Sequence, residues 1–397
     1  MKRKLIYLMS LSVIIASCKK EGCMDPLATN YNEKAKEDDG SCEYDQESVT
    51  YTGTQDSPVT LQNLENGANE TDYYVEGNWT IESEVTIEAG TVIEMAAGAR
   101  ININSGGSLT AIGTANEKII FRGAQSTPGY WDYIRFNGSN NNKNEFSHVI
   151  IQDGGGNSSW DASLYCYSDG RLKINNSTIR DGKHSGMIVY SEDFELDEFS
   201  NNTIENCTQM AVKINASDMG VIDGNSTLSG NGDDYFEVTG GDVELEQTWS
   251  KTSAPFYINA SIDINNDVTI DPGANILMGP SAKIKITSTG SLNAIGTASD
   301  HITFDGEQST KGYWDYILFY SSNNTSNEFQ YVDVSYGGGN SSWDASIYVY
   351  SNSYFKIGNS SINNSQSWGI MDHNNDNNFN DDGNNTFSGN TNGEIGN

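Results

Sequence analysis

The sequence predicts an all-β chain that folds as a solenoid, in which short strands stack coil upon coil. Short apolar runs with a two-residue alternation recur along the chain, which is the pattern of strands. No segment after the N-terminal apolar run shows the 3.6-residue periodicity of a helix. A gap-free internal duplication indicates a frame whose layers cannot change length easily.

The composition suits many short strands joined by tight turns. The 397 residues include 40 Gly and are rich in Asn, Ser and Asp, which favour turns. Acidic residues number 54 against 22 Lys and Arg, which gives a net charge of −32. This charge argues against nucleic acid as a partner, because phosphates attract clustered Lys and Arg. It also disfavours acidic polysaccharides unless cations intervene.

Residues 1–17 have the pattern of a signal peptide: a basic start, an apolar run too short to span a bilayer, and small residues before Cys18. The stretch IASC at 15–18 resembles the lipobox of bacterial lipoproteins. This resemblance implies that Cys18 becomes the lipidated first residue of a tether at 18–22, with the lipid bilayer as partner. A plain secretory signal is the alternative.

The charged tract KKE at 19–21 resembles those that send lipoproteins of Bacteroidetes-type bacteria to the outside of the cell. The resemblance implies an outer-membrane lipoprotein that is exposed at the cell surface. A soluble tether without an export role is the alternative.

Residues 23–44 form a small module bracketed by cysteines. In an oxidising compartment Cys23 and Cys42 are predicted to form a disulfide, and closing such a loop contributes about 3 kcal/mol. The string GCMDPLATNYNEKAKEDDGSCEY resembles a short repeat of secreted proteins from marine Bacteroidetes. Asp25, Asp38 and Asp39 are candidate oxygen ligands for calcium. The alternative is that the aspartates near the end of the module only form a turn.

Residues 45–72 are predicted to be a linker and N-terminal cap, and residues 73–397 the solenoid. Within it, residues 73–206 repeat as 256–389 with a constant offset of 183. The two stretches are called copy 1 and copy 2 below. Because no gap interrupts the match, we expect equivalent residues of the two copies to recur along one solenoid.

Two cysteines fall in copy 1. Cys166 and Cys207 match Val349 and Asn390 of copy 2. Because valine can replace it, Cys166 is expected to be a small buried apolar group. A disulfide between Cys166 and Cys207 is the alternative.

The apolar runs of copy 1 define the expected strands. They are VTI at 85–87, INI at 101–103, IIF at 119–121, VII at 149–151 and LKI at 172–174, with Asn, Gly, Asp and Ser turns between them. Ile87, Ile103, Phe121 and Ile174 are expected to point inward. Strands this short suit the sides of a solenoid coil. A pair of β-sandwiches is the alternative, but their strands would be longer.

The segment TIEAGTVIEMAAGARININSGGSLTAIGTANEKIIFRG, with the phrases GYWDYIRF and NEFSHVIIQDGG that follow it, resembles secreted proteins of the pectin-lyase-like superfamily. The resemblance implies a right-handed parallel β-helix over about four fifths of the chain. It implies little about function, because that superfamily includes lyases, hydrolases, adhesins and inert stalks.

The phrase GGGNSSWDAS occurs at 154–163 and again at 337–346. An exposed Trp can stack on a sugar ring while a neighbouring carboxylate accepts hydroxyl hydrogen bonds. Trp160 with Asp161, and Trp343 with Asp344, are therefore candidate glycan-binding pairs. The alternative is that each Trp folds back over the end of a coil and each Asp caps a turn.

The duplication serves as an internal control for catalysis. No histidine recurs in both copies, and Arg135 becomes Leu318. The carboxylates Asp132 and Glu145 do recur, as Asp315 and Glu328, but neither has a nearby acidic partner in sequence. Lyases and hydrolases of acidic glycans need such paired groups. The sequence therefore shows no catalytic set in duplicate, although a site in one copy only remains an alternative.

The sequence supports a surface-displayed, lipid-anchored β-helix that binds or adheres without catalysis. Its expected partner is a polysaccharide or another surface protein, and calcium is the one cofactor that the module suggests. A polysaccharide lyase or glycoside hydrolase is the first alternative, and a structural stalk is the second.

The lipid anchor can be tested with Cys18→Ala. This substitution removes the acylated thiol, so the protein should move from the membrane fraction to the soluble fraction in detergent-phase separation. Unchanged partition into the detergent phase would contradict the lipoprotein assignment.

Overall fold

The computed structural model describes residues 20–23, 31–37, 39, 41, 49–64, 70–373 and 378–397. The chain divides into two compact units, Met1–Ser48 and Val49–Asn397. None of the helices in the described part is long and apolar enough to cross a membrane.

The smaller unit has little regular structure in its described part. Glu21 and Glu37 form a parallel β-bridge, and Cys23 is buried and disulfide-bonded. Lipidation of Cys18 and the pairing of Cys23 with Cys42 stay predictions. Four residues of those predictions fall outside the described ones: Cys18, Asp25, Asp38 and Cys42.

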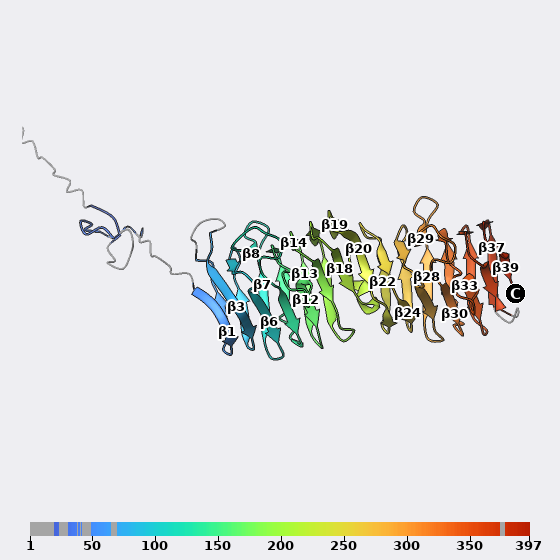
Figure 1. Ribbon diagram of the computed structural model, residues 1–397, viewed down its shortest axis with the longest axis horizontal. Coiled ribbons are helices and arrows are strands. Elements are labelled where there is room, and N and C mark those ends of the chain that lie inside the picture. Colours follow the sequence, from blue (N-terminus) through green and yellow to red (C-terminus); the bar gives the residue numbers. More distant parts are fainter. Residues whose placement is uncertain are drawn as a thin grey trace, which may run out of the picture. The chain divides into compact units, whose positions relative to one another are not determined.

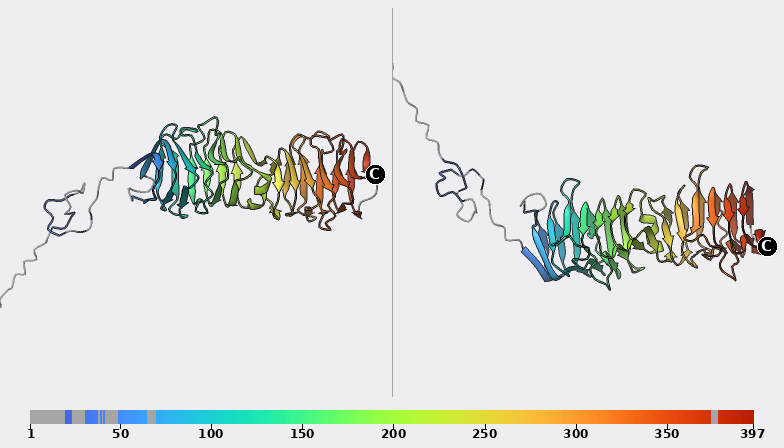
Figure 2. Two further views of the ribbon diagram at one scale, coloured as in Figure 1. Left: turned by 90° about the horizontal axis from the view of Figure 1, so that it is seen from below. Right: turned by 45° about the horizontal axis from the view of Figure 1, so that its top comes forward.

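The larger unit is an all-β, right-handed parallel solenoid of about 14 turns, which confirms the predicted fold class. Its strands stack side by side along the length of this unit, and the C-terminus lies at the last coil (Figures 1 and 2). The first strands, β1(Val49–Gln55) and β2(Val59–Leu61), lie within the range expected to be a linker and cap. The one helix of the described part is a short 3₁₀-helix, η1(Ala216–Val221).

Coils of the N-terminal half have three strands, one on each of three faces, A, B and C, except the coil after β16(Glu195–Ser200), where η1 and Ile222 take the place of a face B strand. The long strand β3(Tyr73–Ile81) pairs with β1 and contributes to two faces, A and C. Face A continues through β6(Arg100–Asn104), β9(Ile134–Asn137), β12(Ala162–Tyr167), β15(Ser185–Val189), β18(Met210–Ile214) and β20(Asp233–Val238). Face B contains β2, β4(Glu84–Ile87), β7(Ser108–Ile112), β10(Glu145–Ser147), β13(Arg171–Asn175) and β16(Glu195–Ser200). Face C contains β5(Val92–Met95), β8(Ile119–Gly123), β11(Val149–Gln152), β14(Thr178–Arg180), β17(Thr203–Glu205) and β19(Thr227–Ser229).

The C-terminal half also has three strands per coil. Face A goes on through β23(Phe256–Ile258), β26(Asn275–Met278), β29(Ile302–Gly306), β32(Val332–Ser335), β35(Ser361–Asn363) and β38(Thr386–Ser388). Face D contains β21(Gly241–Val243), β24(Ser261–Ile264), β27(Lys283–Ile286), β30(Tyr316–Tyr320), β33(Ala345–Tyr350), β36(Trp368–Asp372) and β39(Gly393–Gly396). Face E contains β22(Gln247–Trp249), β25(Asp267–Ile270), β28(Ser291–Ile295), β31(Glu328–Gln330), β34(Tyr354–Gly358) and β37(Asn378–Gly383).

Copy 2 is displaced by one face relative to copy 1. The offset of 183 makes β26 the equivalent of β5, yet β5 lies on face C and β26 lies on face A. Likewise β27 is equivalent to β6 but lies on face D instead of face A. The distance along the chain from a strand of copy 1 to its equivalent in copy 2 therefore corresponds to a whole number of coils plus one strand. Equivalent residues recur along one solenoid, as expected, but on different faces.

The interior is a continuous column of apolar side chains. Ile87, Ile103, Phe121 and Ile174 are all buried, as predicted from the alternation. Aromatic rings stack from coil to coil, as Phe319 does on Phe355 at a centroid distance of 4.5 Å. Each fully buried side chain of this size contributes about 1.5–3 kcal/mol.

Asparagines at the corners tie successive coils together. Asn202, which is buried, donates from Nδ2 to the Ile174 carbonyl at 3.0 Å and accepts at Oδ1 from the Ser177 amide at 3.0 Å. Its counterpart Asn385 accepts from the Ser360 amide at 2.9 Å. Both asparagines thus bond to backbone groups of the previous coil. Beside Asn385, the Asn384 amide also donates to Asn359 Oδ1 of the previous coil at 3.1 Å.

Cys166 and Cys207 are buried and free, so the expected apolar role is confirmed and the alternative disulfide between them is not formed. Burial raises the pKa of the Cys207 thiol to about 11 and raises that of Cys166 as well. Both thiols are therefore protonated and unreactive at neutral pH.

The inward direction of β4 can be tested with two neighbouring substitutions. Ile87→Asp places an unpaired charge in the core and should lower the free energy of unfolding by about 3–5 kcal/mol. Thr86→Asp, at an exposed position on the same strand, should cost no more than about 1 kcal/mol. Denaturant unfolding measures both. Equal costs would mean that inside and outside are wrongly assigned.

Candidate functional site: two outward aromatic clusters

The loop GGGNSSW at 154–160 adopts a backbone conformation that requires glycine at two of its positions. Gly155 and its counterpart Gly338 both have φ of 77°, which is left-handed backbone. A Cβ on Gly156 would lie only 2.5 Å from the carbonyl oxygen of Gly129. The loop therefore packs directly against the backbone of the loop before β9.

Asn157 fixes the tryptophan at the end of this loop. Its Oδ1 accepts hydrogen bonds from the amides of Ser159 at 2.9 Å and Trp160 at 3.1 Å. Its Nδ2 donates to Asp132 Oδ2 at 3.2 Å. In copy 2 the same three bonds join Asn340 to Ser342, Trp343 and Asp315, at 2.9, 3.2 and 3.1 Å. Asp132 and Asp315, which recur in both copies, thus position the tryptophan loops.

Each tryptophan folds back over the outer surface of the sheet and stays half-buried. Trp160 meets Tyr165 edge-on at a centroid distance of 5.0 Å and an angle of 88°. Trp343 meets Tyr348 in the same way, at 4.9 Å and 89°. A second tyrosine lies 5.2 Å from each tryptophan, Tyr167 in copy 1 and Tyr350 in copy 2. The arrangement is therefore a repeated device and not an accident of one loop.

Cluster 1 lies on face A and cluster 2 lies on face D. Cluster 1 consists of Tyr133, Arg135, Trp160, Tyr165, Tyr167 and Tyr190. Cluster 2 consists of Tyr316, Tyr320, Trp343, Tyr348, Tyr350 and His373. In both, buried tyrosines form the base and exposed ones the rim: Tyr190 is 62% exposed and Tyr320 is 39% exposed.

A cation lies against each cluster, but it comes from a different position in each. The Arg135 guanidinium lies 4.2 Å from the centroid of the Trp160 ring, a cation–π contact. Burial lowers the pKa of Arg135, but the side chain remains a cation at neutral pH. Leu318 stands at this position in cluster 2, where Lys285 instead lies 5.5 Å from the Tyr320 ring. Both clusters thus combine flat rings with a cation at one side.

The predicted carboxylates lie beside the clusters. Burial first, and then the charge of Asp161, raises the pKa of Tyr165. Burial and the charge of Asp344 raise the pKa of Tyr348 in the same way. These hydroxyls therefore stay protonated donors at neutral pH, and the half-buried aspartates next to them stay available as acceptors. Each predicted aspartate therefore lies beside the cluster that contains its tryptophan.

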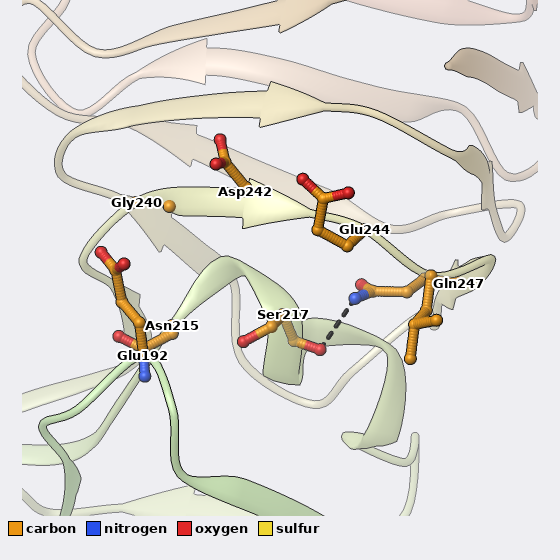
Figure 3. Close-up of a pocket in the computed structure, with 9 residues that line it drawn as sticks. Glu192, Asn215, Ser217, Gly240, Asp242, Glu244 and Gln247 are labelled. Carbon is orange, nitrogen blue, oxygen red and sulfur yellow. Dashed lines mark hydrogen bonds between the residues drawn. The ribbon is translucent and has the colours of Figure 1, made fainter. Parts of the chain in front are cut away.

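A separate acidic pocket lies between the end of copy 1 and the segment that joins the two copies. Its volume is about 300 Å³, and Glu192, Asp242 and Glu244 border it beside the exposed Leu245. Figure 3 shows Asp242 and Glu244 projecting from β21 and the turn after it, with Glu192 on the opposite side. Gln247 also lines the pocket, and its Nε2 donates to the Ser217 carbonyl at 2.7 Å.

Asp218 borders the adjoining groove, and only 4% of it is exposed. Burial raises the pKa of Asp218 to about 7, against the opposing effect of hydrogen bonds from Asn215 and Leu196. Asp218 Oδ2 accepts from the Asn215 amide at 3.2 Å, so the carboxyl caps η1. Its raised pKa is the consequence of a buried cap, and the group is not free to act on a ligand.

Of the three predicted calcium ligands, only Asp39 lies among the described residues. Asp39 Oδ1 accepts a hydrogen bond from the Ser41 amide at 3.0 Å, whereas Asp25 and Asp38 lie outside the described residues, so the calcium site and its turn alternative both stay predictions. The bonds with Ser41 also lower the pKa of Asp39. Across the described ranges, no group of three or more His, Cys, Asp or Glu side chains is placed to hold a metal ion.

The sequence indicated the tryptophans but missed the tyrosines beneath them. Tyr165 and Tyr167 alternate with the buried Cys166, and Tyr348 and Tyr350 flank Val349, so the two-residue period could have marked them as outward. The parallel solenoid predicted by resemblance is confirmed as the fold, whereas kinship with pectin-lyase-like proteins stays a prediction. No family model, no curated protein and no solved structure matches this chain.

Proposed function

We propose that this chain is a non-catalytic glycan-binding module, displayed on the outer membrane by a lipid anchor at Cys18. The observation that carries the proposal is the repeated cluster, a half-exposed tryptophan held over tyrosines on an open sheet face. The C–H face of a sugar ring packs on such aromatic surfaces, and the neighbouring hydroxyls and carboxylates can bond its hydroxyl groups.

The open faces suit a polymer better than a small molecule. Small ligands are normally enclosed by a concave pocket, whereas clusters 1 and 2 lie on the outer surface of sheets. The net charge of −32 repels polyanions. The proposed ligand is therefore an uncharged polysaccharide.

The test uses the two tryptophans and a panel of a β-glucan, a mannan, an α-glucan and the polyanion alginate. Trp160→Ala or Trp343→Ala should weaken binding at its own cluster about tenfold, or about 1.4 kcal/mol, and should lower the melting temperature far less than loss of a fully buried tryptophan. Isothermal calorimetry with short oligosaccharides and thermal unfolding give the two readouts. Alginate should not bind.

The matched control is Trp131→Ala. Trp131 is fully buried and donates from Nε1 to the Gln152 carbonyl at 2.8 Å, so its loss should lower the melting temperature by several degrees. If Trp160→Ala and Trp343→Ala behave like this control and binding is unchanged, the tryptophans are packing residues. In that case the stalk interpretation replaces glycan binding.

The rival function is glycan hydrolysis, and the acidic pocket at Glu192, Asp242 and Glu244 is the observation that favours it. Hydrolases need two carboxyls at a defined separation, one of them protonated. The one buried carboxyl of the region, Asp218, is engaged in capping η1. Release of reducing ends from any polysaccharide of the panel, abolished by Asp242→Asn, would establish the rival.

A further inference from the structure

The two clusters do not share a face of the solenoid. The outward residue at the centre of cluster 1 belongs to a row that stays on face A through the junction. This row contains Arg135, Tyr165, Ile188, Lys213, Glu237, Tyr257 and Leu277, each paired with the next. The corresponding row of cluster 2 lies on face D and contains Lys285, Leu318, Tyr348 and Met371.

The displacement separates the clusters both along and around the solenoid. Successive coils rise by about 4.8 Å, so equivalent residues of the two copies lie on the order of 35 Å apart along the axis. A shift of one face in a three-faced coil adds a rotation of about a third of a turn. A straight polymer lying across cluster 1 therefore continues over face A of copy 2, where Tyr257 and Leu277 lie, and not over cluster 2.

We infer that the chain cross-links polysaccharides: cluster 1 binds one polymer and cluster 2 binds another. The inference rests on the proposed glycan binding and adds its geometry. If the two copies lay in line on one face, two equivalent sites in a row would instead hold one long polymer. Two sites in a row would strengthen binding to a single polymer by about 10²–10⁴-fold. Two sites on different faces give no such gain but join separate polymers.

The test uses the full chain with Cys18→Ala, because acyl chains would themselves gather many copies. Beads coated with the best-binding neutral polysaccharide of the panel report cross-linking by clumping. A surface with widely spaced single polymers reports dissociation. The wild-type clusters should clump the beads, and Trp160→Ala and Trp343→Ala should each abolish clumping. From single polymers, all three proteins should dissociate at rates within about threefold of one another.

Several outcomes would overturn the inference. If the protein with both clusters intact dissociated from single polymers about a hundredfold more slowly than either tryptophan variant, both clusters would be holding one polymer. Clumping that persists in both variants would show self-association of the chain. Two short oligosaccharides bound per chain without any clumping would refute cross-linking and leave glycan binding intact. Failure to bind any oligosaccharide would remove the proposed function and this inference together.

Discussion

Every coil of this solenoid depends on the pairing of each strand with the strands one coil before and one coil after. The backbone bonds of an interior strand have no other partner, so the inward side chain of one coil must lie on the inward side chain of the next. The junction respects this rule. Phe236 of β20 pairs with Phe256 of β23 in the apolar core, while Glu237 pairs with Tyr257 on the opposite side of the same sheet, where both side chains are also largely buried. The ladder does not require that equivalent strands share a face, only that inside meets inside, which is why copy 2 can begin one face later.

The junction is also where the chain departs from regular strands. In the coil after β16, η1 and Ile222 occupy the place where face B would have its next strand. Ile222 forms an isolated parallel β-bridge with Phe199 of β16. The helix end is closed by the buried Asp218, and the first strands of faces D and E both contact η1. A buried polar cap and an added strand thus occupy the segment that separates the copies. The acidic pocket lies at the same place, and its position follows from this local change of structure.

Alternation allowed the sequence to predict the fold and the inward residues, because one buried face per strand leaves a two-residue signature, as at Ile87 and Phe121. The sequence could not predict that equivalent strands of the two copies lie on different faces. Coil length varies: 33 residues separate Ile101 from its partner Ile134, but 23 separate Leu164 from Met187. An offset of 183 residues therefore does not reveal whether it spans whole coils. The Trp–Asp pairs were found from the repeated phrase, whereas η1 and the buried Asp218 left no distinctive pattern.

The account depends on the displacement of copy 2 by one face, which a pair of engineered cysteines can test directly. Glu237 and Tyr257 are paired on adjacent strands of face A, at a spacing that a disulfide can close. The double variant with Glu237→Cys and Tyr257→Cys should form an intramolecular disulfide on oxidation, detected by mass spectrometry after proteolysis. Glu237→Cys with Asp263→Cys, which joins face A to face D, should not. Closure of the second pair in preference to the first would place the two copies in line and contradict the account.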